Sequence, residues 1–559
     1  MKKPLLKTLT LDNRQDFEFD ANTFEYTVDI PDGNPRLPKI CATAEDGVDV
    51  KVLRPIRAPQ SRTATAKIVL TSGEDKTEYV LNFIQDASLG FVMQYDDRYA
   101  FAPEYSGKGK LKFSSSDESV LTVSEDGVIH AVALSSTPVS VTAKVCRTTV
   151  ATLTVDRVER APLNIFYATG QSNSRGSYDQ GIDRPTEQLK MESAPLGNTY
   201  FLYVDPNTGA FSTDEIYDFG EKIKSGFHGA LTKRWHELTG EKTLMVICAC
   251  DGVAIHSWAE DGRMYGYAKT VSAAVEALYS APDSPFEINR RGFFWTHGET
   301  QMVRWYERGK GYVQDSKRLL WDNEYYDRFI AIRNNMINDL KVDFGAIVLV
   351  RANRNRARKE SIELGMLTDL LPIRAAQYAV NNTTDSSLFI ASRVGDYAKM
   401  PDFHDSTAYG FGFVGPQNLH YTQTGYNEQG RVLAENLYGA LSPTSDRTPT
   451  ELELLDSDGR TRLNDGDELT VHQDSGHRIA AIVLPLYNDA PQVKYTVTEG
   501  ADICNIDVYG NIRFTAAASL GDTAEITAQS ESGLVRRVRA RLAAATEESA
   551  NDQTQNQIG

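Results

Sequence analysis

The chain has 559 residues, of which 41% are hydrophobic and 24% are charged, and its formal net charge is −17. This length predicts roughly three to five globular domains with enough apolar material for several cores. The acidic balance argues against nucleic acid or an anionic membrane surface as the main partner, because both repel negative charge. No apolar run approaches ~18 residues, so the sequence predicts no membrane span.

The five cysteines are scattered along the chain. Cys248 and Cys250 lie two positions apart in an apolar strand, so their side chains point to the same face and do not suit a disulfide with each other. No metal-ligand spacing appears, and we expect buried free thiols, no metal and no cofactor. The segment 1–9 has the charges of a signal peptide but lacks its apolar core. We expect a trimmed chain or one without a signal peptide, located outside the cell, on its surface or in a virion.

Two strand-rich units precede the centre of the chain. In the first, residues 1–86, the segments 24–31 and 79–83 alternate apolar and polar side chains as half-buried strands do. In the second, residues 87–159, an Asp-Gly pair at 126–127 separates alternating segments, which is typical of a hairpin. The first unit resembles a cadherin-like bacterial β-sandwich, and the second resembles a bacterial Ig-like domain.

The chain changes character between residues 160 and 443, where apolar strands alternate with amphipathic helices. Continuous apolar runs predict a parallel sheet that is covered on both faces. The expected strands are 163–168, 243–249, 292–296, 346–350 and 388–391, and the expected helices are 229–239, 267–279, 322–340, 372–381 and 426–440. The fold class is therefore multidomain, with a central three-layer α/β/α domain between all-β sandwich domains.

Residues 444–545 return to the strand-rich pattern of the second unit, so a further Ig-like sandwich is expected there. The polar tail, residues 546–559, is expected to be disordered. Sandwich folds carry many roles, and we expect these units to act as spacers or to dock to other proteins or glycans.

The segment 164–176 predicts a buried strand that breaks at Gly170 and presents Ser172 at the start of a helix. Hydrolases of the α/β class expose a nucleophile in this way. The motif Gly-Gln-Ser-Asn resembles the SGNH hydrolases, in particular the branch of the sialate O-acetylesterases and carbohydrate esterase family six. The resemblance implies a flavodoxin-like sheet and a nucleophilic role for Ser172, whose amide would also donate to an oxyanion. A serine that only caps a helix is the alternative.

A second block, residues 225–231, leads into an amphipathic helix and contains two glycines. SGNH enzymes have a glycine here whose amide joins the oxyanion hole. Gly229 fits that role best by its distance from the helix, and Gly226 is the alternative. An ordinary glycine turn would give the same local pattern.

A third block, residues 293–301, resembles the segment Trp-x-Gln-Gly-Glu-x-Asp of the carbohydrate esterase branch. The matching residues are Trp295, Gly298 and Glu299. His297 replaces the glutamine and Gln301 replaces the aspartate. Because a neutral histidine donates one N–H, His297 is a candidate third donor to the oxyanion.

A fourth block resembles the segment of the catalytic histidine, with His420 just before the last helix. The usual form is Asp-x-x-His, but Gln417 stands three positions before His420, and an amide cannot stabilise an imidazolium as a carboxylate does. In the carbohydrate esterase branch the glutamate of the third block can take this role. Glu299 is therefore the candidate acid, and Asp402 and Asp405 are the runners-up.

Together these blocks imply a serine esterase that removes O-acetyl groups from sialic acid or an acetylated polysaccharide through an acyl-enzyme. The candidate substrate contacts are Gln171, Asn173, Trp258, Trp295 and Arg351. One alternative is a noncatalytic glycan-binding or structural protein of a phage tail or cell surface with a degenerate esterase domain, and the changes at 297, 301 and 417 keep this alternative open. Another is an esterase of a different acyl group.

Overall fold

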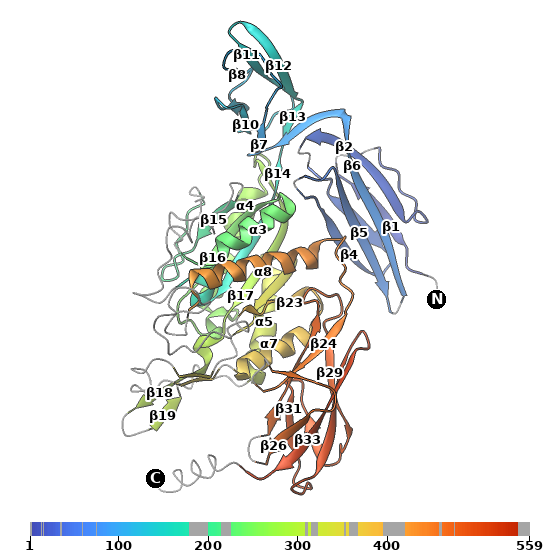
Figure 1. Cartoon of the computed structure of the whole chain (residues 1–559), viewed down its shortest axis with the longest axis vertical. Coiled ribbons are helices and arrows are strands. Elements are labelled where there is room, and N and C mark those ends of the chain that lie inside the picture. Colours follow the sequence, from blue (N-terminus) through green and yellow to red (C-terminus); the bar gives the residue numbers. More distant parts are fainter. Residues whose placement is uncertain are drawn as a thin grey trace.

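Figure 1 shows the computed structural model of the chain. The residues that it describes are 3–12, 14, 16–33, 36–58, 60–73, 75–177, 199–213, 225–307, 311–314, 322–350, 354–356, 367–369, 371–394, 420–457, 461–473 and 476–545. Among the helices in these ranges, none is long and apolar enough to cross a membrane.

The first β unit is a sandwich. Its strands are β1 (Leu6–Leu11), β2 (Glu25–Gly33), β3 (Ile40–Ala44), β4 (Asp49–Ile56), β5 (Thr63–Ser72) and β6 (Asp75–Gln94). One sheet pairs β1 with β3, and the other joins β2, β4, β5 and β6. Side chains from both sheets share one core, which includes Leu9 of β1 and Leu81 and Phe83 of β6. Apolar positions at a period of two therefore place one face of each sheet in this shared core.

The second β unit is tied to the first by a shared strand. It contains β7 (Arg98–Ala100), β8 (Lys112–Ser115), β9 (Leu121–Val123), β10 (Val128–Ala131), β11 (Val139–Val145), β12 (Thr148–Val155) and β13 (Arg157–Glu159). The strand β6 continues to Gln94, where it pairs with β13. The expected boundary between residues 86 and 87 thus falls inside one strand, because β6 is long enough to take part in both units.

The central sheet is parallel and has the order β15-β16-β14-β17-β20-β23. Its strands are β14 (Ala161–Gly170), β15 (Thr199–Tyr203), β16 (Lys242–Ala249), β17 (Phe286–Thr296), β20 (Phe344–Val348) and β23 (Leu388–Ser392). The five expected strands lie in or within two residues of these elements, and β15 adds an edge strand that was not anticipated. Without β15 the order is the 2-1-3-4-5 of flavodoxin-like sheets. The strand order therefore reverses between β14 and β17, although all strands remain parallel.

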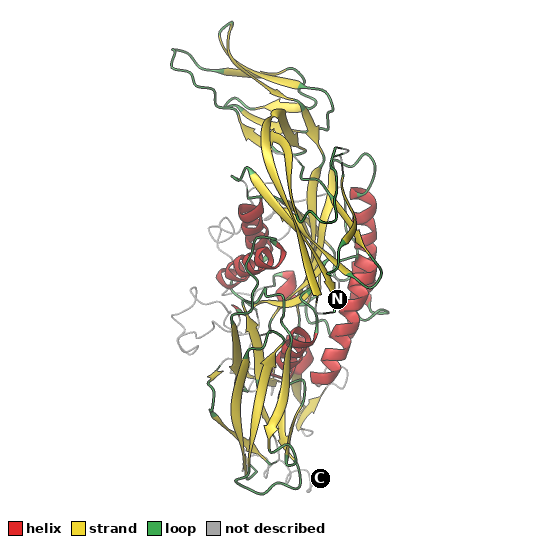
Figure 2. Ribbon diagram, turned by 90° about the vertical axis from the view of Figure 1, so that its right-hand side faces the viewer, coloured by secondary structure: helices red, strands yellow, loops and turns green. Residues whose placement is uncertain are grey.

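Helices cover both faces of this sheet (Figure 2). On one face α3 (His228–Thr239) and α8 (Gln423–Leu441) pack against Phe166 and Phe294. On the other face α4 (Arg263–Tyr279), α5 (Asp322–Leu340) and α7 (Leu371–Thr383) contribute to the core around Tyr167 and Trp295. Two apolar faces with amphipathic helices on each explain why the strands are apolar throughout.

Three short helical turns and a small four-stranded sheet decorate the central domain. The turns are α1 (Ser172–Arg175), η1 (Ile255–Trp258) and η2 (Glu299–Met302), and the small sheet contains β18 (Val303–Glu307), β19 (Gly311–Gln314), β21 (Arg354–Arg356) and β22 (Leu367–Asp369). The small sheet was not anticipated, because its strands are too short to show a clear period.

The C-terminal β unit packs on the central domain. Its strands are β24 (Glu451–Leu455), β25 (Arg462–Leu463), β26 (Glu468–His472), β27 (His477–Arg478), β28 (Ala480–Leu484), β29 (Val493–Glu499), β30 (Cys504–Ile506), β31 (Asn511–Phe514), β32 (Thr523–Ser530) and β33 (Val535–Ala543). Asn382 of α7 donates a hydrogen bond to the carbonyl of Ala481 at 2.9 Å, and Ile482 lies in the central core. Part of this unit is thus continuous with the domain that carries the motifs.

The five cysteines are all free. Cys248, Cys250 and Cys504 are buried, as expected, whereas Cys41 and Cys146 are exposed. Cys41 faces outward from β3, and Cys146 lies in the turn between β11 and β12, where it has a positive φ of 53°.

Candidate active site

Ser172 lies where the strand order of the central sheet reverses. The strand β14 ends at Gly170, its neighbour β17 ends at Thr296, and Gly170 is paired with Thr296 in the ladder. Ser172 begins α1 directly after β14 and is 5% exposed. Ligands of open α/β sheets bind outside the carboxyl ends of the strands at such a reversal.

The turn before Ser172 requires a glycine. Gly170 has a φ of +121°, and a Cβ on it would lie 2.1 Å from the carbonyl oxygen of Thr296. The carbonyl of Gly170 accepts a hydrogen bond from Trp258 at 3.2 Å, and the amide of Gln171 donates to Thr296 at 3.0 Å. These contacts fix the direction in which the chain leaves the strand.

Substituting Gly170 by alanine is expected to lower the free energy of unfolding by about 3 kcal/mol or more, because the backbone would be strained and would collide with a second strand. Gly252 is the matched control, since it also has a positive φ, +62°, but nothing lies within 4 Å of its Cβ position. Gly252→Ala should cost only about 1 kcal/mol. Urea unfolding of the two variants measures the difference, and equal losses would mean that the close approach is unimportant.

Gln171 connects the serine segment to the loop after β17. Its side-chain oxygen accepts hydrogen bonds from the amides of Gly298 and Thr300, both at 3.3 Å. The residue is 1% exposed. It was expected to contact substrate, and in the structure its oxygen instead holds the Glu299 loop against the start of α1.

Asn173 brings Glu299 beside the serine. The Asn173 amide nitrogen donates to Oε1 of Glu299 at 2.7 Å, and its oxygen accepts from the hydroxyl of Tyr426 at 3.0 Å. Glu299 is 4% exposed, and its Oε2 has no hydrogen-bond partner among the described residues. A buried carboxylate oxygen without a partner is unusual, because each such oxygen normally accepts a hydrogen bond.

The second block packs against the end of α1. His228, at the start of α3, donates from Nε2 to the carbonyl of Ser174 at 2.7 Å, and desolvation lowers its pKa to about 4. The carbonyl oxygen of Ser174 can only accept, so Nε2 carries the hydrogen. Gly229 follows in the first turn of α3, where N–H groups have no partner within the helix.

The two glycine alternatives are distinguished by the side chain of Gln423. Its oxygen accepts from the amide of Gly226 at 3.2 Å, and its nitrogen donates to the carbonyl of Gly226 at 3.1 Å. The amide of Gly226 is therefore occupied, which leaves Gly229 as the candidate oxyanion donor from this block.

His420 stands just before α8 and is half-buried. Thr422 caps α8 by accepting from the amide of Gly425 at 3.0 Å. The contacts of Gln423 with Gly226 and of Tyr426 with Asn173 place the first turn of α8 at the end of the sheet that carries Ser172. The hydroxyl of Ser172 itself has no hydrogen-bond partner in the described ranges.

His297, expected as an oxyanion donor, is engaged inside the core. Its Nε2 lies 3.1 Å from the carbonyl of Val253, its Nδ1 lies 3.4 Å from the hydroxyl of Tyr325, and the residue is 1% exposed. Desolvation lowers its pKa to about 3, so the ring is neutral at pH 7. A neutral ring has one N–H, and the Val253 carbonyl already accepts it. We therefore leave His297 out of the oxyanion hole.

The neutral His297 makes stability depend on pH. Because its pKa is about 3 in the folded chain and 6.5 as a free side chain, only the unfolded chain takes up this proton between these values. The contribution of His297 to the free energy of unfolding is therefore fully present above pH 6.5, and it is lost progressively as the pH falls toward 3. His297→Gln should remove about 2.5 kcal/mol of the loss between pH 7 and pH 4.5. Urea midpoints at both pH values test this, and an unchanged loss in the variant would mean that His297 is protonated in the folded chain.

The two tryptophans that were expected to contact substrate are core residues. Trp258 and Trp295 are both 0% exposed, and their rings lie 5.6 Å apart, edge to face. The indole N–H of Trp295 donates to the hydroxyl of Tyr325 at 3.1 Å, as that of Trp258 does to Gly170. Because the rings and the N–H groups of both tryptophans make their contacts inside the core, these residues support the candidate site structurally.

Several expected residues fall outside the described part. These are Arg351, Asp402, Asp405, Gln417 and the side chain of Gln301. Sequence reasoning missed two residues that join the blocks, Gln423 and Tyr426. Their polar groups on the buried side of an otherwise amphipathic helix were the available signal. Among described residues, no group of three or more histidine, cysteine or acidic side chains gathers as a metal site would require.

No family model matches the chain, and no curated protein matches it. Among solved structures, a protein from Arabidopsis thaliana is similar over 49% of this chain and 97% of its own length, at 17% identity and a TM-score of 0.31. A carbohydrate acetylesterase from Xanthomonas citri is similar over 80% of this chain and 94% of its own, at 12% identity and a TM-score of 0.34. A xylanase with a bacterial Ig-like domain from termite gut covers 46% of this chain and 61% of its own, at 14% identity and a TM-score of 0.12.

Proposed function

We propose that this chain is a serine esterase of the SGNH type, which removes O-acetyl groups from a carbohydrate. The observation that carries the proposal is the position of Ser172. Ser172 starts a helix at the carboxyl end of β14, where the strand order of the sheet reverses. Asn173, the next residue, holds the buried carboxylate of Glu299 by a hydrogen bond. A serine that serves only as a helix cap does not require this neighbourhood.

In the proposed mechanism His420 takes the proton of Ser172 as the serine oxygen attacks the ester carbonyl. The amides of Ser172 and Gly229 donate to the oxyanion of the tetrahedral intermediate. His420 then gives its proton to the leaving sugar hydroxyl, and acetyl-serine remains. Water, deprotonated by His420, attacks this acyl-enzyme and releases acetate, and the proton returns to Ser172.

Glu299 is the proposed acid of the triad. Asn173 fixes one carboxylate oxygen at 2.7 Å and thereby orients the other, Oε2, which has no partner among the described residues. The N–H of His420 would fill that position in the substrate complex, since catalytic hydrogen bonds often form only there. A carboxylate there stabilises the imidazolium that forms during proton transfer.

Acetate release from a panel of O-acetylated glycans, sialylated and xylan-type, tests this function. We expect release from at least one class, and the release should persist in the presence of a chelator because the proposed chemistry uses no metal. Absence of release from every glycan by a folded protein would favour a glycan-binding or structural role. Release that stops in chelator would require a different mechanism.

A further inference from the structure

A cavity of about 490 Å³ lies at the end of the central sheet where β14 begins, whereas Ser172 follows the end where β14 stops. Residues 36–57 of the first β-sandwich form one wall, the end of β6 forms another, and the base of the α/β domain closes it through Pro162, residues 236–241 and residues 287–291. Pro162 is the second residue of β14 and Gly170 is its last, so that at ~3.3 Å per residue the two lie roughly 26 Å apart. The cavity is therefore separate from the candidate active site.

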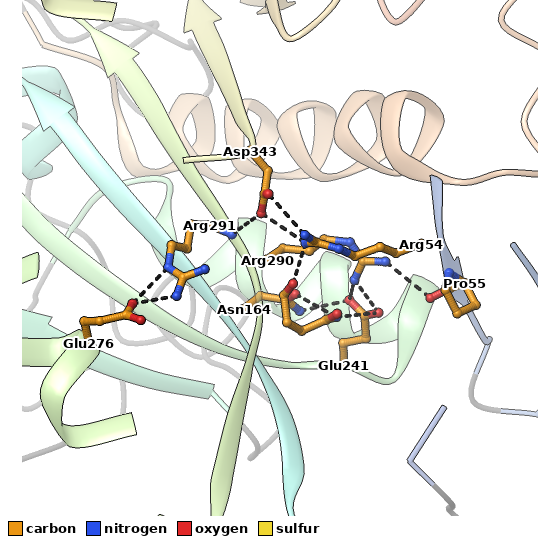
Figure 3. A network of polar contacts seen from close by, with 9 residues as sticks. Arg54, Pro55, Asn164, Glu241, Glu276, Arg290, Arg291 and Asp343 are labelled. Carbon is orange, nitrogen blue, oxygen red and sulfur yellow. Dashed lines mark hydrogen bonds and ion pairs between the residues drawn. The ribbon is translucent and has the colours of Figure 1, made fainter. Parts of the chain in front are cut away.

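The acidic side chains of the wall are already neutralised. The pairs are Glu241 with Arg290 at 2.6 Å, Asp97 with Lys242 at 2.6 Å, and Glu287 with Arg36. Figure 3 shows the first of these pairs, with Asn164 also directed at Glu241 and with Arg54 and Arg291 held by Asp343 and Glu276. Each of the three acidic side chains of the wall is thus already paired with a cation.

Arg57 lines the cavity and has no ion pair with a described residue. Its side chain is half-buried, and its Nη1 is buried without a hydrogen-bond partner in the described part of the chain. Desolvation lowers the pKa of Arg57 from its ordinary value, which Asp97 and Asp32 offset only in part. Arg98 and Lys39, both exposed, also line the cavity, and neither has an ion pair with a described residue. A guanidinium nitrogen that is buried without a hydrogen-bond partner is costly, and an anion beside the group lowers that cost.

The rest of the wall suits an organic body. Leu37, Pro38, Val52, Pro55 and Ile288 contribute apolar surface, while Gln94, Thr239 and Asn289 contribute polar groups. The volume lies in the range of small-molecule sites, which are mostly apolar with a few placed polar groups. A guanidinium binds carboxylate and phosphate through two parallel N–H···O bonds.

We propose that this cavity binds a small organic anion, whose carboxylate or phosphate is held by Arg57 with Arg98 at the rim. The ligand has the size of a monosaccharide, its body lies against the prolines and aliphatic side chains, and its charge replaces the missing partner of Arg57. The proposal does not depend on esterase activity.

Isothermal titration calorimetry of the full chain with glucuronate and with glucose 6-phosphate tests the proposal, and glucose is the uncharged control. We expect at least one of the two anions to bind and glucose not to bind, with the stronger anion showing whether the site prefers carboxylate or phosphate. Arg57→Gln should weaken binding at least ~10-fold, which corresponds to the loss of one charge-assisted hydrogen bond. Ser172→Ala should bind as the unmodified chain does.

Arg541→Gln is the control, because Arg541 is an exposed arginine of the C-terminal β unit, pairs with Glu468 and is not part of the wall. It should leave binding unchanged. Where Arg57→Gln fails to fold, as judged by circular dichroism, Arg98→Gln replaces it, with an expected loss of severalfold. Three results would overturn the proposal: binding of neither anion, binding by Arg57→Gln (or by Arg98→Gln where it replaces it) as tight as that of the unmodified chain, or loss of binding in Ser172→Ala.

Discussion

Replacement of Ser172 by alanine is expected to lower acetate release by at least ~10³-fold, because the acyl-enzyme can no longer form. The fold should persist, since the Ser172 hydroxyl makes no hydrogen bond to a described residue and the helix α1 is held by Gln171 and Asn173. Turnover on the glycan that the unmodified chain deacetylates best, together with a urea unfolding curve, measures both expectations.

Ser174→Ala provides a control from the same turn of helix. Its hydroxyl is buried and has no hydrogen-bond partner among the described residues, whereas its backbone carbonyl, which contacts His228, is unaffected by the substitution. This variant should keep its activity. Full turnover by Ser172→Ala would remove Ser172 from the mechanism, and an equal loss in both variants would point to a structural disturbance of α1.

Glu299→Gln is expected to lower turnover by about 10³- to 10⁴-fold, because a neutral amide cannot stabilise the imidazolium of His420. The substitution conserves shape, and the glutamine oxygen can still accept from Asn173, so the unfolding midpoint should change little. Measurement of kcat and KM separates the effects, and the loss should lie in kcat because substrate binding does not use this carboxylate.

Asp402 and Asp405, which precede His420 in the sequence, are the alternative triad acids against which Glu299 is compared. Asp402→Asn and Asp405→Asn should keep near-normal turnover, since neither is the proposed acid. A normal rate in Glu299→Gln with a large loss in one aspartate variant would transfer the role of the triad acid to that aspartate.

The sequence was sufficient to predict the central sheet, because continuous apolar runs between amphipathic helices allow few other folds. It also placed Ser172 and Glu299 at strand ends, and the sheet order then makes those ends neighbours. The shared strand β6 could not be predicted, since the alternation of buried and exposed side chains stops between Ile84 and Phe91, although the strand continues through this stretch. Local pattern shows that a strand exists and leaves open which sheets it joins.

The roles of the aromatic residues near the site depend on contacts that are distant in sequence. Trp295 is covered by Tyr325 and Phe329 of α5, and the Tyr325 hydroxyl also meets His297. A motif with tryptophan and histidine at a strand end fits a substrate site as well as a core, and only the position of α5 distinguishes them. The same holds for Gln423, whose contact with Gly226 spans 197 residues.

The most direct test of the central claim is covalent labelling with a fluorophosphonate, followed by mass spectrometry of the digested chain. Such probes react with serines that an adjacent base activates. The proposed mechanism predicts one stoichiometric adduct on the peptide that contains Ser172, and its loss in His420→Ala. An adduct on a different serine, or no adduct on a chain that releases acetate, would contradict the assignment of Ser172 as the nucleophile.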